Sequence, residues 1–143
     1  MRRRLKSERG TALLETALVL PLVLLVSVSI FEFGRAYQTF QVLTNAAREA
    51  ARIAVLPGTT TSDINARVQA YLTAGQLSDP ASATVDIQSS TISIGLGTAP
   101  STRITVNYPF SFMVLDPVAK LVVSNSTLGG AFTMSVQAEM RNE

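Results

Sequence analysis

The chain contains no cysteine and no histidine. Without cysteine there is no disulfide and no thiolate nucleophile, although this absence does not identify the compartment, because many exported domains lack disulfides. Without histidine the chain has neither the commonest general base nor the commonest metal ligand. We therefore expect a protein that is not an enzyme and that binds no metal or cofactor.

Charged residues are also scarce, at 15% of the 143 residues, whereas hydrophobic residues reach 47%; about a quarter of a soluble domain is usually charged. The length allows one domain of ordinary size with appendages. Residues 1–10 hold five basic residues and one acidic residue, a net charge of +4, and the remaining seven basic and nine acidic residues leave −2. The basic character belongs to a short leader, and nothing beyond it suggests a nucleic-acid partner.

An apolar stretch of 21 residues follows this leader, from Thr11 to Phe31, and Glu15 is its single charge. About 20 residues cross a bilayer as a helix, and the basic residues on its N-terminal side place the leader in the cytoplasm. A cleaved secretory signal is the alternative, but its apolar part would span about 7–15 residues and end at small residues. We expect a single-pass protein of the cell (inner) membrane, in contact with lipid over residues 11–33, with the C-terminal part periplasmic or extracellular.

The helical pattern continues beyond the membrane through residues 34–56, until Pro57 and Gly58 end it. A helix from about Thr11 to Leu56 would be on the order of 70 Å long at 1.5 Å per residue. In the C-terminal part of this expected helix, small residues recur at helical spacing on the same side as Leu43. They are Ala47, Ala50, Ala51 and Ala54. Because alanine allows close backbone approach, this stripe packs against either the chain's own head or helices of other subunits, and both can hold at different positions.

Residues 57–143 are expected to form an α+β head domain. Ile64, Val68 and Leu72 recur every four residues, which predicts an amphipathic helix over residues 63–74 that Gly75 closes. An apolar–polar alternation then covers four segments, separated at residues 95–97, 100 and 129–130, and predicts a small antiparallel sheet with one solvated face. The four segments are residues 84–88, 91–94, 103–108 and 132–140.

Residues 109–123 are the least regular part of the head, and we interpret them as an irregular apolar loop packed on the sheet. Residues 118–123 within them could instead form a short helix or an edge strand. Tyr108 and Phe110, just before, are expected in the core and not in a ligand platform. Glu32 and Arg35 are three residues apart and can pair on a helix at the membrane edge.

Glu15 is the most informative residue, because an unpaired carboxylate inside an apolar span costs several kcal/mol and its default interpretation is functional. It follows Gly10 by five residues, after a basic leader and at the start of an apolar helix. This arrangement resembles the type IV prepilin processing motif. The resemblance implies that a membrane-embedded prepilin peptidase cuts between Gly10 and Thr11, and that Glu15 pairs with the N-terminal amine of a neighbouring subunit. Desolvation cancels much of such an attraction, so the pair would mainly fix the axial register between helices.

Four further stretches resemble the TadE-like family, the minor pilins or pseudopilins of tight-adherence (Tad/Flp) pilus systems. They read IFEFGR at residues 30–35, NAAREAAR at 45–52, VNYPF at 106–110 and AEMR at 138–141. The resemblance implies a type IV pilin-like fold. It also implies three kinds of partner: a prepilin peptidase, other pilins and pseudopilins, and an inner-membrane assembly platform.

Two positions depart from related patterns. Thr11 stands where other type IV pilins commonly have phenylalanine, which puts N-methylation in doubt. Thr16 stands where Flp-type major pilins often have tyrosine after the glutamate, which argues against the major subunit.

The expected domains are a cleaved leader (1–10), a transmembrane helix (11–33), its extracytoplasmic extension (34–56) and the head (57–143). The alternative is an uncleaved, signal-anchored envelope binding module, and incorporation into the pilus itself is left open.

Overall fold

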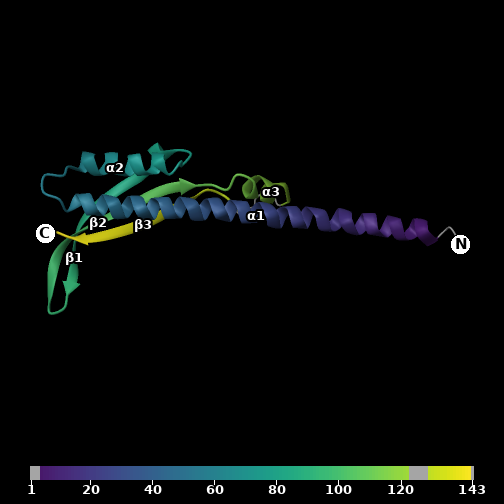
Figure 1. Cartoon of the computed structure of the whole chain (residues 1–143), viewed down its shortest axis with the longest axis horizontal. Coiled ribbons are helices and arrows are strands. Elements are labelled where there is room, and N and C mark those ends of the chain that lie inside the picture. The colour runs from purple at the N-terminus through teal and green to yellow at the C-terminus, as the bar shows by residue number, and fades with distance from the viewer. Residues whose placement is uncertain (1–3, 123–128, 143) are drawn as a thin grey trace.

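The longest element of the computed structural model is one N-terminal helix, α1, over Arg4–Ala54. The structure describes residues 4–122 and 129–142, with side chains at residues 10–118, 120 and 129–142. At 1.5 Å per residue the 51 residues of α1 extend for about 76 Å. The head domain lies along the C-terminal half of α1, and the N-terminal half extends away from it (Figure 1). The predicted long helix is confirmed; it starts within the leader and ends two residues before Leu56.

Three strands form one antiparallel sheet in the order β1-β2-β3, with β2 in the centre. They are β1 (Thr84–Ile94), β2 (Gly97–Phe110) and β3 (Phe132–Arg141). The sheet confirms the prediction, but the two segments predicted at 84–88 and 91–94 are one strand. Pro100, which was expected between strands, lies inside β2 opposite Thr91 of β1, and the pairs with β3 begin one residue later, at Ser101. On the β3 side, its carbonyl accepts a hydrogen bond from the backbone of Asn142, just past the end of β3. A missing N–H is tolerated there, since no third strand needs it.

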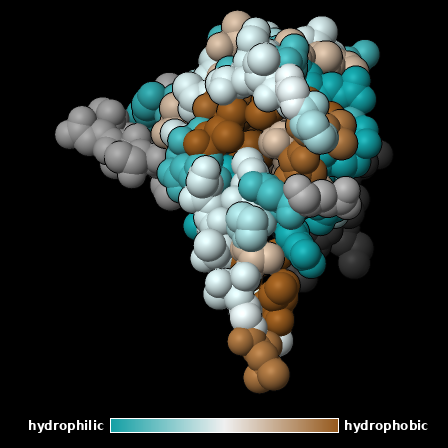
Figure 2. Space-filling model, turned by 90° about the vertical axis from the view of Figure 1, so that its left-hand side faces the viewer, coloured by the Kyte–Doolittle hydropathy of each residue, from teal (hydrophilic) through white to brown (hydrophobic). Residues whose placement is uncertain are grey.

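β1 and β2 form a hairpin that projects from the head. Ile94 pairs with Gly97, which leaves a two-residue turn of Gly95 and Leu96. Gly95 has a φ of +70°, a left-handed conformation that glycine adopts without strain. The end-on view in Figure 2 shows this arm with an apolar tip, where Leu96 is fully exposed.

A second helix, α2 (Thr61–Ala74), lies beside α1 and starts with a capping box in which Thr60 and Asp63 bond reciprocally. Gly75 closes it, as predicted, and its missing side chain matters, because a Cβ there would overlap the side chain of Val42 on α1. A short 3₁₀ turn, η1 (Pro80–Ser82), leads into the sheet. α2 is therefore held close to α1 at its C-terminal end.

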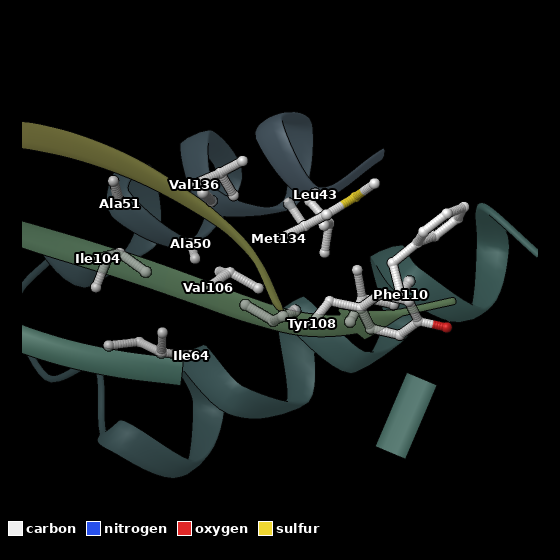
Figure 3. Close-up of a cluster of buried hydrophobic side chains, with 14 residues drawn as sticks. Leu43, Ala50, Ala51, Ile64, Ile104, Val106, Tyr108, Phe110, Met134 and Val136 are labelled. Atoms are coloured by element: carbon white, nitrogen blue, oxygen red, sulfur yellow. The ribbon is translucent and has the colours of Figure 1, made fainter. Parts of the chain in front are cut away.

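The hydrophobic core lies between the two helices and one face of the sheet. It contains Leu43 and the alanines of α1, the predicted Ile64, Val68 and Leu72 of α2, and apolar side chains of β2 and β3 (Figure 3). The strand residues are Ile104, Val106, Tyr108, Phe110, Met134 and Val136. They alternate along each strand, so the opposite face is polar, as the period of two predicted.

The short helix α3 (Leu115–Val122) corrects the expectation of an irregular loop over residues 109–123. Of the two alternatives for residues 118–123, the helix is the one observed; Val123 lies outside the described residues. Pro117 stands near the start of α3, where its missing N–H has no helical partner to lose. Asp116 in the first turn pairs with Lys120 one turn later at 2.7 Å, which adds a helical pairing that an apolar loop would not make.

Candidate functional site: the exposed helix and its junction with the head

The N-terminal half of α1 has a continuous exposed apolar surface. Leu18 and Leu22 are 79% and 62% exposed, and the other large side chains from Leu13 to Val26 are exposed as well. A water-soluble monomer rarely exposes an apolar patch larger than a few hundred Å². α1 is long and apolar enough to cross a membrane by length and composition, and this half of it is compatible with a single-pass membrane anchor.

Gly10, Thr11 and Glu15 all lie in the N-terminal half of α1 that extends away from the head (Figure 1), here called the free half of α1. No atom lies within 4 Å of the place where a Cβ on Gly10 would stand. Glu15 is exposed and stands about 7.5 Å further along the axis, at 1.5 Å per residue. None of the described side chains bonds to its carboxylate, and Thr16, the next residue, uses its hydroxyl on the carbonyl of Ala12 at 2.9 Å. The Glu15 carboxylate is thus exposed on the surface of this half of α1.

The alanine stripe lies under the chain's own head. Ala47, Ala50 and Ala51 have no exposed surface, and Ala54 is half-buried. Ala46, which the sequence pattern did not single out, is equally buried. The structure therefore places these alanines at contacts within the chain, in the core that α1 forms with α2 and the sheet, while the exposed apolar surface of α1 lies nearer the N-terminus.

A buried carboxylate marks the junction of the free half of α1 with the head. Glu32 is 5% exposed and accepts hydrogen bonds from the backbone N–H groups of Met113 and Val114, at 3.1 and 3.0 Å. Arg35 completes the site: it pairs with Glu32 at 3.1 Å, as predicted, and donates to the carbonyl of Ser111. Charge-assisted hydrogen bonds of this kind are stronger than neutral ones.

Aromatic rings surround this junction. Phe110 contacts Phe112 and Phe132 with ring centroids 5.3 and 5.6 Å apart, and Phe33 of α1 contacts Phe112 at 5.8 Å. The guanidinium of Arg35 lies 4.5 Å from the centroid of Phe110, a cation–π contact. Tyr108 and Phe110 are buried core residues, as expected. Sequence reasoning missed the bonds of Glu32 to the 113–114 backbone; an acidic residue between Phe31 and Phe33, directly after the apolar stretch, was the available signal.

A second ionic contact joins α1 to α2. Glu49 pairs with Arg52 of α1 at 2.8 Å and with Arg67 of α2 at 2.7 Å. Hydrogen bonds from Arg52 and then Arg67 lower the pKa of Glu49 from 4.5 to about 2. On the polar face of the sheet, Glu139 accepts from Ser101 and Arg103, and these bonds lower its pKa as well.

A groove of about 360 Å³ lies between α1, the segment after α2 and the end of β2, and Arg35, Thr39, Gln76, Tyr108 and Ser111 are among its lining residues. Within residues 10–118, 120 and 129–142, no three acidic side chains come together as a metal site would require. The features that stand out are therefore the exposed apolar helix with Glu15 and the polar junction at Glu32.

In a comparison with known families, the model of the TadE-like protein family matches residues 10–52. The match starts at Gly10 and includes Glu15, the α1 residues of the junction (Glu32 and Arg35) and Ala47, Ala50 and Ala51; Ala54 lies just beyond it. Comparison with curated proteins and with solved structures gives no match. The stretches of the head that resembled the family, at residues 106–110 and 138–141, lie outside the matched region. This chain carries a TadE-like segment over residues 10–52, as the resemblance of its sequence predicted.

Proposed function

We propose that the chain is a non-catalytic minor pilin or pseudopilin that takes part in the assembly of a Tad-type pilus. The observation that carries this proposal is the state of the TadE-like segment: it is a helix whose apolar half is free of the chain's own head and bears an exposed Glu15. A carboxylate in an apolar environment is stable only when a charged or hydrogen-bonding partner meets it. An amine from an adjacent subunit is such a partner.

Processing by a prepilin peptidase between Gly10 and Thr11 would supply that amine. The scissile bond lies inside α1, so the helix has to unwind locally before a peptidase can reach the backbone. Glycine in a helix interior is about 1 kcal/mol less favourable than alanine, so Gly10 makes this opening easier. The new N-terminus of Thr11 would then pair with Glu15 of the neighbouring subunit. The leader would remain in the cytoplasm, and the head would face the periplasm or the cell exterior beside the assembly platform and other pilins.

A complementation experiment in a strain that carries the cognate pilus genes tests this function. Deleting this chain should abolish or strongly reduce piliation, and the wild-type chain should restore it. Glu15→Ala should fail to restore it although the protein accumulates in the membrane. Thr16→Ala is the matched control, because Thr16 lies on the same turn and bonds only within the helix. Normal piliation with Glu15→Ala would argue against the assembly role.

The second candidate is an uncleaved, signal-anchored module that binds an envelope partner through its sheet. The projecting β1–β2 hairpin favours it, because Leu96 at the tip is fully exposed and Ile94 is 46% exposed. Retention of residues 1–10 in the mature protein would support this candidate over the pilin.

A further inference from the structure

The segment from Met113 to Val122, here called the 113–122 segment, is fixed to a defined position along α1. The N–H groups of Met113 and Val114 bond to Glu32, which follows the 21-residue apolar stretch directly. At 1.5 Å per residue that stretch extends for about 30 Å, the thickness of the hydrocarbon core of a bilayer. The segment therefore starts where the hydrocarbon would end.

α3, the helical part of this segment, reaches back along α1 towards the N-terminus. It lies beside α1 on the N-terminal side of the sheet (Figure 1). Between Thr11 and Ile30, only residues 27–29 are partly covered. Val28 lines the same open groove, of about 710 Å³, as Met113 and Val114. The 113–122 segment thus overlaps the last turns of the apolar stretch.

The exposed side chains at this level are apolar. Met113 is 71% exposed and Val114 is 41% exposed, beside Ile30 at 68%, Phe31 at 80% and Phe33 at 62%. They extend the apolar surface of the free half of α1 sideways onto the head. A surface of this kind is unfavourable in contact with water, because transferring apolar area out of water is favourable.

The charges of the segment suit the boundary between hydrocarbon and water. Asp116 and Lys120 neutralise each other at 2.7 Å. The Lys120 side chain is 54% exposed, and a lysine can extend its ammonium group to lipid headgroups while its methylene chain stays on an apolar surface.

We propose that the 113–122 segment lies in the interfacial layer of the membrane, with Met113 and Val114 in contact with lipid acyl chains. The inference rests on the proposed insertion of α1. Lipid is the occupant because this surface is continuous with about 30 Å of apolar helix that the same bilayer would surround. The segment would then be a second membrane contact, which sets the depth and the rotation of the head relative to the bilayer before assembly.

Single-tryptophan fluorescence of the full chain tests this, because the chain has no tryptophan of its own. Met113→Trp, Leu25→Trp and Leu96→Trp are reconstituted separately at low protein-to-lipid ratio in phosphatidylcholine vesicles, with and without bromine on the acyl chains. Leu25 reports insertion of α1, and Leu96 is a matched exposed apolar position at the distant hairpin tip. Circular dichroism checks each fold, and Val114→Trp replaces Met113→Trp if that variant does not fold.

We expect brominated lipid to quench Leu25→Trp strongly, Met113→Trp to a clear but smaller extent, and Leu96→Trp hardly at all. If Leu25→Trp is quenched while Met113→Trp behaves like Leu96→Trp, the interfacial contact is wrong although insertion stands. If Leu25→Trp is not quenched, the membrane insertion on which the inference rests has failed. Blue-shifted but unquenched emission from Met113→Trp that depends on protein concentration would assign the surface to a second copy and overturn the proposal.

Discussion

The backbone N–H of Met113 donates a 3.1 Å hydrogen bond to the carboxylate of Glu32, which lies 81 residues earlier in the chain. This bond ties the head to the point where the apolar stretch of α1 ends. Glu32 also has Val114 and Arg35 as partners, so its charge is satisfied within the chain. Glu15, on the same helix, bonds to none of the described side chains. These two acids of the N-terminal helix therefore differ: Glu32 is buried and bonded within the chain, whereas Glu15 is exposed.

Glu32→Ala should loosen the junction without unfolding the head core. Two backbone N–H groups and Arg35 lose their acceptor, and leaving such groups unsatisfied costs about 1–3 kcal/mol. Hydrogen exchange in detergent micelles should show faster exchange of the Met113 and Val114 amides, while amides of β2 at Ile104 and Val106 keep their protection. Glu32→Gln, which retains one acceptor oxygen, should show a smaller effect. Unchanged protection of Met113 in Glu32→Ala would contradict the assigned bonds.

Acid should weaken the contact between the two helices. The pKa of Glu49 is lowered from 4.5 to about 2 by Arg52 and Arg67, so the unfolded chain binds more protons than the folded chain between these pH values. The stabilisation is therefore complete above pH 4.5 and is lost as the pH falls towards 2. Thermal unfolding should give a higher midpoint for wild type than for Glu49→Gln at pH 7, and the gap should close on acidification. A gap that stays constant from pH 6 to pH 2.5 would refute the pKa assignment.

Ala50→Leu should destabilise the head, because Ala50 has no exposed surface where α1 meets the sheet. Extra methylene groups in a packed core typically cost about 1–3 kcal/mol. Asn45→Leu introduces the same side chain on an exposed face of α1 and should be close to neutral. Denaturant or thermal unfolding of both variants measures the difference. Equal midpoints would mean that the alanine stripe does not pack within the subunit.

Gly75→Ala should also lower stability, although alanine is a better residue than glycine in most positions of a helix. The added Cβ would overlap the side chain of Val42 on α1, so the C-terminal end of α2 must move away. Val42→Ala creates space, and the double variant should recover part of the loss. A double-variant cycle of unfolding free energies measures this coupling. Strict additivity of the two changes would show that the residues are not in contact.

Periodic patterns predicted most of the fold. The four-residue spacing of Ile64, Val68 and Leu72 located α2 and its buried face. The alternation of apolar and polar residues located the strands of the sheet. The continuity of β1 was hidden by residues 88–91, since four successive polar residues (Gln88, Ser89, Ser90 and Thr91) break the alternation. For α3, a helix was one of the alternatives and a loop was favoured, because a short apolar run fits a helix, a strand or a loop equally well.

Contacts between distant segments were beyond local sequence patterns. The spacing of Glu32 and Arg35 predicted their pair, whereas the bond from Met113 to Glu32 depends on how a segment 81 residues away folds back onto α1. Likewise, the alanine stripe predicted close packing without identifying its partner. The structure places Ala47, Ala50 and Ala51 against the chain's own head, which follows from tertiary packing and not from helical periodicity.

The intact mass of the membrane-extracted protein tests the central claim most directly. The chain should be produced beside its cognate prepilin peptidase and, separately, beside an inactive one. The account predicts loss of residues 1–10 only with the active enzyme, and no loss in a Gly10→Leu variant. Gly34→Leu, at an equally uncrowded helical glycine, should still be processed, because a Cβ at either position has no atom within 4 Å. A full-length mass in both samples, with the peptidase shown to cut another pilin, would contradict the pilin assignment and favour the uncleaved anchor.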